Sequence, residues 1–299
     1  NCNTVNGSMT ITGNNITNLA PLTQLQFVKG NLVINSCPNL MSLNGLHNII
    51  KIDSSLDISQ NIALQNMNYM YSLTEVGQDF ALYYNTNVQN LIGFAGLQKI
   101  GRNMILDGMP MTSFIGIPNL DSIKGYLQIR HLHNIQNMQG FNGLSYLNAL
   151  AIIECYGIQD LDGLQGITTL NEGFFTSYSS MVDFHGLNNV TYIGGLGVDY
   201  NQGGNAQLQS MEGFNSLQTV DGHFLIGWAN RLKNVNALSN LTSVSGDFML
   251  NSCDSLMNLN GLQNMNHTGG LSILGCNILE NLIGLNGLVS MSGNLRIDY

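Results

Sequence analysis

A short β-strand signature recurs along the whole chain at nearly constant spacing. Its first apolar residue occurs thirteen times, at intervals of 22 to 24 residues apart from a single interval of 28. A fixed period in this range is typical of a solenoid, in which each repeat buries its apolar face only against its neighbours. The marker residues are Met9, Leu32, Leu56, Phe80, Met104, Leu127, Leu150, Phe174, Leu196, Phe224, Phe248, Leu271 and Leu295.

The repeat at residues 30–52 shows how one rung of the coil is built. Leu32 and Ile34 alternate with their neighbours in the period-two pattern of a half-buried strand. The other apolar residues follow at intervals of three, at Leu40, Leu43, Leu46 and Ile49. The pattern therefore predicts an all-β, parallel β-solenoid of about twelve rungs of 23–24 residues, with little or no helix.

No Pro- or Ser-rich linker interrupts the period, which predicts one continuous solenoid over residues 1–299. Two fused halves, at about 1–150 and 151–299, are the alternative organisation. A glycine also precedes an apolar residue at one fixed point of many repeats, where we expect a corner that needs a positive φ or a close approach of two backbones. These glycines are Gly45, Gly93, Gly140, Gly163, Gly213, Gly261 and Gly284.

Composition disfavours two classes of partner. The net charge is −9 and Lys and Arg total only nine, so nucleic acid and anionic membrane surfaces are poor partners. No apolar run approaches about 18 residues, so no membrane span is expected in this sequence. Five N-x-[ST] sequons favour a secreted or surface-displayed protein with N-linked glycans, at Asn6, Asn15, Asn189, Asn240 and Asn266.

Asn and Cys alternate at one register position of the repeats. The position of Cys37 holds Asn14, Asn61, Asn85, Cys155, Cys253 and Cys276 in other rungs. This alternation resembles that of leucine-rich repeats, where the side chain satisfies buried backbone groups at a turn. Cys253 and Cys276 lie in consecutive rungs, so a disulfide between them is a candidate. The chain has no C-x-x-C pair, which disfavours zinc and thioredoxin-like chemistry.

Three segments carry a resemblance to a known family. They are the opening Asn1-Cys2-x-x-Val5-x-Gly7-x-x-x-Ile11, the segment GNLVINSCPNLMSLNGL at 30–46 and its echo GDFMLNSCDSLMNLNGL at 246–262. With these segments the chain resembles the receptor L-domain family. Its members are the right-handed, leucine-rich-repeat-like ligand-binding lobes of insulin- and epidermal-growth-factor-type receptors, with relatives on fungal and protist cell surfaces. The resemblance implies a right-handed β-solenoid that binds a ligand.

Two features depart from that family. Its receptor lobes usually have half as many rungs and are followed by a cysteine-rich module, which this chain lacks. The growth-factor-receptor function is therefore not carried over. In the family, the cysteine that matches Cys2 typically pairs with one upstream. We expect Cys2 to be unpaired, paired elsewhere or left behind by a trimmed segment.

No motif indicates catalysis, and we expect a protein that is not an enzyme and uses no cofactor or metal. His131 and His133 are the only close pair of histidines, and solvent-facing polar residues are a better interpretation of them than a metal site. Asp160 and Asp162 flank Leu161 and are interpreted as a solvated turn in preference to calcium ligands.

The outward face of the marker strands is unusually aromatic and weakly charged, which suits a protein or glycan ligand. The alternative is that these rings only cover neighbouring backbone. Ile105 and Ile153 share the face. The predicted ligand-binding residues are Tyr83, Tyr84, Phe175, Tyr178, Tyr200, Leu225 and Trp228.

The longest interval and the last strand bear on function. Residues 200–207 insert a Gly-rich loop beside the aromatic face, and insertions in solenoids often lie on the binding face. The alternative is a tolerated loop with no role in binding. Leu295 begins a thirteenth rung that no capping helix follows. Two functions stay open. One is an extracellular recognition or adhesion module, and the other is a structural subunit whose copies stack end to end in a filament or coat.

Overall fold

The computed structural model describes residues 2–198 and 206–298. The predicted all-β class and parallel β-solenoid of about twelve turns are confirmed. The helices among the described residues are three 3-10 segments, η1 (Ala20–Leu22), η2 (Asn236–Leu238) and η3 (Ile283–Leu285). The chain forms two compact units, Asn1–Leu147 and Asn148–Tyr299.

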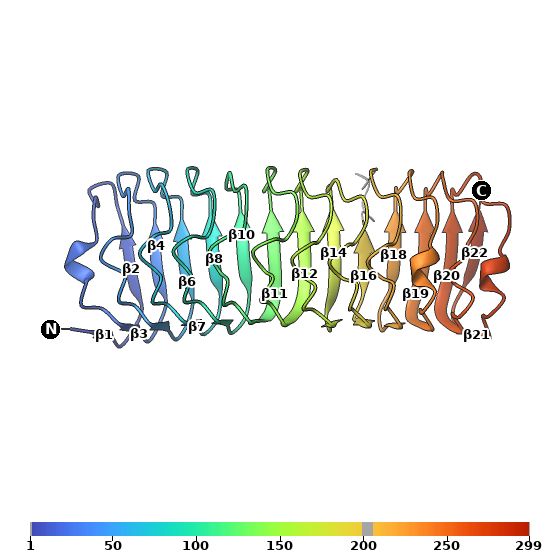
Figure 1. Cartoon of the computed structure of the whole chain (residues 1–299), viewed down its shortest axis with the longest axis horizontal. Coiled ribbons are helices and arrows are strands. Elements are labelled where there is room, and N and C mark those ends of the chain that lie inside the picture. The colour runs from blue at the N-terminus through green and yellow to red at the C-terminus, as the bar shows by residue number, and fades with distance from the viewer. Residues whose placement is uncertain (1, 199–205, 299) are drawn as a thin grey trace. The chain divides into compact units, whose positions relative to one another are not determined.

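The first unit stacks its marker strands in one parallel row. Their register advances by one repeat at each step, so that Met9 lies beside Leu32 and Leu32 beside Leu56. Figure 1 shows β2 to β10 of this row side by side, with all arrows in one direction. The strands are β2 (Met9–Thr12), β4 (Leu32–Asn35), β6 (Leu56–Ser59), β8 (Phe80–Tyr83), β10 (Met104–Asp107) and β11 (Ser122–Arg130).

A row of two-residue strands precedes the marker strands in the same unit. Its members also pair in parallel, with Lys51 beside Glu75 and Glu75 beside Lys99. The side chains of Lys51 and Glu75 form an ion pair of 3.2 Å on the surface. The strands are β1 (Thr4–Val5), β3 (Phe27–Val28), β5 (Lys51–Ile52), β7 (Glu75–Val76) and β9 (Lys99–Ile100).

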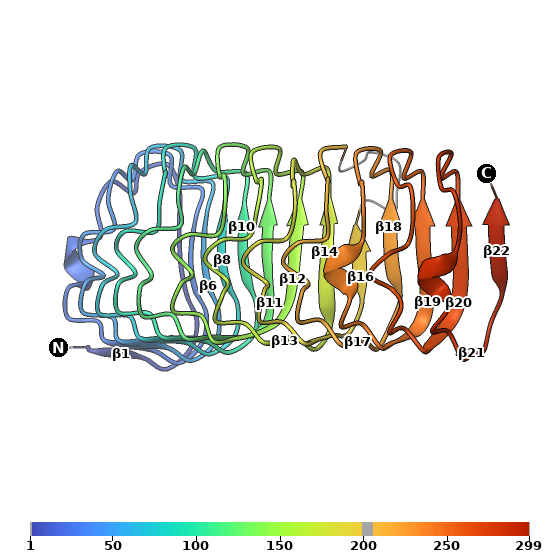
Figure 2. The ribbon, with the colours of Figure 1, turned by 45° about the vertical axis from the view of Figure 1, so that its right-hand side comes forward.

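The second unit repeats this arrangement. Its marker strands are β12 (Tyr146–Ile153), which begins in the first unit, β14 (Gly173–Ser177), β16 (Leu196–Val198), β18 (Phe224–Gly227), β19 (Ser243–Asn251), β20 (His267–Leu274) and β22 (Leu295–Asp298). The short strands β13 and β17 lie along the lower edge of this unit in Figure 2. The short strands are β13 (Thr169–Leu170), β15 (Tyr192–Ile193), β17 (Thr219–Val220) and β21 (Ser290–Met291).

Each unit has an apolar interior made by equivalent residues of successive rungs. In the rung that begins at Gly30, the marker residues and those spaced by three are all fully buried. Phenylalanine rings meet within the interior. Phe80 and Phe94 are edge to face with ring centroids 4.8 Å apart, and Phe224 and Phe248 are stacked with ring centroids 4.7 Å apart. Burial of a large side chain contributes roughly 1.5–3 kcal/mol, so this interior supplies most of the driving force for folding.

Asn61 and Asn85 form a hydrogen-bonded ladder inside the first unit. Oδ1 of Asn61 accepts from the N–H of Cys37 at 3.0 Å, and Oδ1 of Asn85 accepts from the N–H of Asn61 at 3.1 Å. Their amide groups donate to the carbonyls of Ile34 and Ile58 at 2.9 and 2.8 Å. Both asparagines are fully buried. Their predicted role in satisfying buried backbone groups is confirmed.

Cysteine takes the same position in other rungs. Cys37, Cys155, Cys253 and Cys276 are all fully buried. A hydrogen bond between the thiols of Cys253 and Cys276, together with burial, raises the pKa of Cys253. The structure holds every cysteine of the chain as a thiol, so the candidate disulfide between Cys253 and Cys276 is not formed in it.

Glycine occupies one corner of most rungs, as predicted. Six of the seven expected glycines have φ between 104° and 123°. The seventh, Gly284, lies in η3, where an added Cβ would overlap the carbonyl oxygen of Leu259 in the preceding rung. Tyr69 stands at this corner in the third rung with a φ of 80°. Such a backbone conformation costs a residue with a side chain about 1–3 kcal/mol.

Replacing Asn61 by Ala is expected to lower the free energy of unfolding strongly. The change leaves the N–H of Cys37 and the carbonyl of Ile34 buried without partners, at about 1–3 kcal/mol each. Urea unfolding followed by circular dichroism measures the loss. Cys37→Ala is the matched control, because its Sγ makes only weak contacts such as that of 3.6 Å to the carbonyl of Ile11. Equal losses in the two variants would contradict the role of the amide ladder.

Replacing Tyr69 by Gly is expected to raise the thermal stability, because glycine adopts a positive φ without strain. Gly93→Ala changes the same corner of the next rung in the opposite sense, and an added Cβ there would overlap the carbonyl oxygen of Met67. We expect Gly93→Ala to lower the melting temperature. Scanning calorimetry of both variants tests the pair, and a loss of stability in Tyr69→Gly would show that the ring contributes more than the strain costs.

Candidate functional site

The residue that follows each marker strand adopts a left-handed conformation. Where a described residue at this position is not glycine, its φ lies between 50° and 56°. The conformation ends the strand and turns the chain sharply. The outward residues of the strand and this turning residue together make up what we call the strand face. The non-glycine turning residues are Ser36, Gln60, Tyr84, His131, Glu154, Tyr178, Trp228 and Ser252.

In the first unit, two predicted residues lie on the strand face. Tyr83 ends β8 and is half-buried, whereas Tyr84 is 47% exposed. The ring of Tyr84 lies against Gly108 of the next rung, where any added Cβ would overlap it. Burial, followed by the charge of Asp57, raises the pKa of Tyr83. Tyr84 therefore both covers backbone, as the alternative interpretation expected, and keeps an exposed surface.

Charged side chains border these tyrosines. Oδ1 of Asp107 lies 2.6 Å from Nδ1 of His131, and Oδ2 of Asp107 lies 4.0 Å from Nε of Arg130. His131 and His133 stand edge to face, with ring centroids 6.5 Å apart. The aromatic surface of the first unit is therefore narrow, because the next rung replaces tyrosine by ionic side chains.

In the second unit, an apolar row crosses the strand face. Phe175 is 38% exposed, and its ring lies over Gly197, which has no side chain to displace it. Leu225 is half-buried on the other side of Gly197. Sequence reasoning found these two residues but missed Ala151 and Met249, which share their register. The row consists of register partners on five successive strands, namely Ala151, Phe175, Gly197, Leu225 and Met249.

Two further predicted aromatic residues flank the apolar row. Tyr178 is 37% exposed and follows β14, and Trp228 is half-buried and follows β18. The indole Nε1 of Trp228 is buried and has no hydrogen-bond partner among the described residues. Tyr200 and most of the predicted loop at 200–207 lie outside the described residues. The assignment of all these side chains to a ligand stays a prediction.

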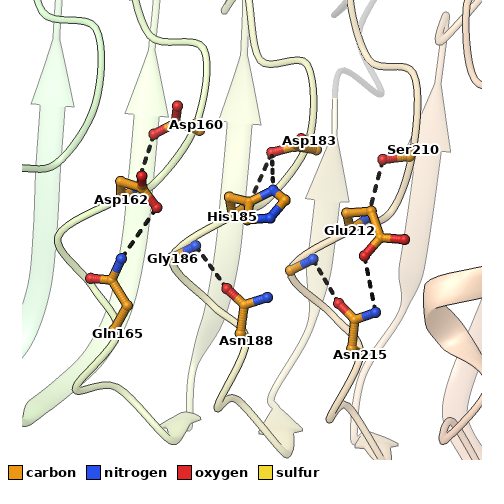
Figure 3. A network of polar contacts seen from close by, with 11 residues as sticks. Asp160, Asp162, Gln165, Asp183, His185, Gly186, Asn188, Ser210, Glu212 and Asn215 are labelled. Carbon is orange, nitrogen blue, oxygen red and sulfur yellow. Dashed lines mark hydrogen bonds and ion pairs between the residues drawn. The ribbon is translucent and has the colours of Figure 1, made fainter.

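A second polar feature lies at the glycine corner of the second unit (Figure 3). Oδ1 of Asp160 accepts from the N–H of Asp162 at 3.0 Å, and Oδ1 of Asp183 accepts from the N–H of His185 at 3.0 Å. Oγ of Ser210 accepts from the N–H of Glu212 in the equivalent turn. The turns at Asp160 and Asp183 are Asx-turns and that at Ser210 is the equivalent ST-turn, in which a side chain replaces a backbone acceptor. Asp160 and Asp162 therefore shape a turn, as the preferred interpretation expected.

Negative charge gathers in the second unit. Residues 148–299 contain twelve of the eighteen acidic residues and three of the nine basic ones, which accounts for the whole net charge of −9. Burial raises the pKa of Asp160, and the nearby charges of Asp162 and Asp183 add to that effect. The hydrogen bond to Asp183 raises the pKa of His185. The pKa values of Asp160 and His185 are therefore both raised at this corner.

The described residues contain no group of three or more His, Cys, Asp and Glu side chains placed to hold a metal ion. No helix in the described part of the chain has the length and hydropathy needed to cross a bilayer.

The five sequon asparagines are all exposed. Two of them also support the coil. Nδ2 of Asn189 donates to the carbonyl of Gln165 at 2.8 Å, and Nδ2 of Asn240 donates to the carbonyl of Asn215 at 2.7 Å. Glycosylation at these five positions stays a prediction.

Comparisons with known proteins agree with this geometry. Residues 1–108 match the receptor L domain, and residues 111–197 match six copies of the BspA-type leucine-rich repeat region. The predicted resemblance to the receptor L-domain family is therefore confirmed. No curated protein sequence matches the chain significantly. Domains of these two families are typically non-catalytic modules that bind or recognise a ligand.

Protonation of His185 is expected to stabilise the second unit. Its folded-state pKa is raised above the ordinary 6.5, so the stabilisation is complete below about pH 6.5 and is lost as the pH rises through the folded value. The raised pKa of Asp160 acts in the same direction at more acidic pH. Melting temperatures of the wild type and of His185→Gln between about pH 5.5 and about pH 8.5 test this. If the difference in melting temperature between the wild type and His185→Gln stays constant across this pH range, protonation of His185 does not stabilise the second unit.

Replacing Asn189 or Asn240 by Ala is expected to cost about 1 kcal/mol of stability, because each loses a hydrogen bond to the preceding rung. Asn15→Ala is the matched control, since Asn15 is an exposed sequon residue whose side chain has no hydrogen bond to a described residue. Urea unfolding of unglycosylated protein separates this loss from any effect of a glycan. If Asn15→Ala loses as much unfolding free energy as Asn189→Ala, the hydrogen bond of Asn189 does not explain the loss.

Proposed function

We propose that this chain, whose residues 1–108 match the receptor L domain, is a non-enzymatic recognition or adhesion module of the extracellular space or cell surface. It binds a protein or a glycan through the strand face. The apolar row of the second unit is the observation that carries this proposal.

The row suits an interface because it combines apolar surface with a rigid base. Phe175, Gly197, Leu225 and Met249 stand on strands that pair with a neighbouring strand on both sides. Binding therefore needs little ordering of the backbone, which lowers the entropic cost of association. Aromatic side chains at such positions commonly contribute most of the binding free energy of an interface. Phe175 and Tyr178 are the two most exposed aromatic residues described on this face of the unit.

The negative charge of the second unit favours a partner with a basic surface. With the whole net charge of −9 in its sequence, the second unit repels acidic surfaces at low salt and attracts basic ones. The partner proposed for this row therefore presents apolar side chains with Lys or Arg around them. Ionic strength is expected to affect the association rate more than the dissociation rate.

An extracellular location is supported by the two matching families, which are typically extracellular or at the surface, and by the exposed sequons. None of the five sequon asparagines belongs to the apolar row.

Trp228, the single tryptophan, offers a direct test of the strand face. A random peptide library and a glycan array are screened against the purified chain, and each hit is titrated while the emission of Trp228 is recorded. We expect hits whose binding shifts this emission and weakens roughly tenfold or more in Phe175→Ala. Val33→Ala is the matched control, because Val33 has the same outward register in the first unit.

Hits that bind equally well to Phe175→Ala and leave Trp228 emission unchanged would place recognition elsewhere. Electron microscopy of the same preparation examines the structural alternative. Isolated particles agree with recognition, whereas copies joined end to end in fibres would favour a filament or coat subunit.

A further inference from the structure

The first unit contains a groove that no strand-face residue lines. It has a volume of about 720 Å³ and lies along the glycine corner of two successive rungs, between residues 112 and 143. Its size falls within the range of small-ligand sites, which are commonly about 300–1,000 Å³. All of its lining belongs to the first unit.

The lining is entirely uncharged and rich in side-chain amides. Gln136 and Gln139 are exposed, and neither side chain makes a hydrogen bond to a described residue. Asn134 is also exposed, and its side chain makes no hydrogen bond to a described residue. An unpaired amide offers one acceptor and two donor hydrogens, so these three side chains present both kinds of group to a ligand.

Two further amides are held in fixed orientations. Oδ1 of Asn137 accepts from the N–H of Gln139 at 3.1 Å, and Oδ1 of Asn142 accepts from the N–H of Gly140 at 3.0 Å. These bonds occupy the oxygens and leave the Nδ2 groups available as oriented donors in the groove. Orientation before binding lowers the entropic cost of forming each hydrogen bond to a ligand.

The groove has a firm base and one apolar wall. The rings of Phe114 and Phe141, next in sequence to lining residues, are fully buried with centroids 5.0 Å apart. Ile115 is 58% exposed, and Pro118 lies beyond it on the same rung. A surface that alternates amides with an aliphatic patch matches a sugar ring, which has hydroxyl groups at its rim and C–H groups on its face.

We propose that this groove binds a neutral oligosaccharide. Amides supply bidentate partners for vicinal hydroxyl groups, and the absence of any charged lining residue gives no advantage to sialylated or sulfated sugars. The site is separate from the strand face and does not depend on what that face binds.

Saturation-transfer NMR of the full chain tests the proposal with four neutral probes, maltohexaose, cellohexaose, mannohexaose and chitohexaose, and with sialyllactose as the charged comparison. We expect transfer to at least one neutral probe, and its loss in the double variant Gln136→Ala/Gln139→Ala. Gln65→Ala/Asn68→Ala is the matched control, because these exposed residues hold the same register positions on an earlier rung of the same unit, outside the groove.

Transfer that survives in the control and in Phe175→Ala but not in the groove variant supports the groove. Failure of all four neutral probes overturns the proposal, as does equal transfer in the groove variant, equal loss in the control, or a preference for sialyllactose. Phe175→Ala keeps this test distinct from that of the strand face. A ligand that Phe175→Ala no longer binds, but that the groove variant still binds, is a ligand of the strand face and not of the groove.

Discussion

Hydrogen bonding between equivalent positions of successive rungs is the constraint on which the rest of the structure depends. The N–H of Leu32 donates to the carbonyl of Ser55 at 2.9 Å, and one rung later the N–H of Leu56 donates to the carbonyl of Asp79 at 2.8 Å. Because the offset is always one repeat, every side chain stands beside its own equivalent. Leucine is therefore packed on leucine inside the coil, and asparagine bonds to asparagine at the turn. A change of residue type at an outward position alters the chemistry of the surface without removing a buried contact of the coil.

This regularity separates the support of the coil from its surfaces. The buried positions recur in nearly every rung, whereas the outward positions differ between the two units. The strand face carries tyrosine beside an ionic cluster in the first unit and an apolar row in the second. The glycine corner is lined by neutral amides around residues 112–143 and by carboxylates around Asp160, Asp183 and Glu212. One scaffold thus offers surfaces that suit partners of different chemistry.

Much of the candidate site could be located from the sequence, but its composition could not. Alternation around Phe175 and Leu225 places both residues outward, since a strand has a period of two. Ala151 and Met249 were missed because neither is aromatic, and only the register of β12 and β19 brings them into the same row. The positions of the rings of Tyr84 and Phe175 over Gly108 and Gly197 depend on which residue follows one rung later. The amide groove also escaped prediction, because asparagine and glutamine in turns read as ordinary solvated loops.

The sequence by itself determined the architecture, because a period of 23–24 residues with apolar positions at fixed places has one way to bury them, each rung against the next. It also indicated the amide ladder and the glycine corner, since Asn or Cys recurs at the first position and Gly recurs at the second in most rungs. Only the tertiary structure decided which corners use 3-10 turns and which outward side chains meet. Those outcomes depend on contacts between residues more than twenty positions apart, whose distances no local pattern specifies.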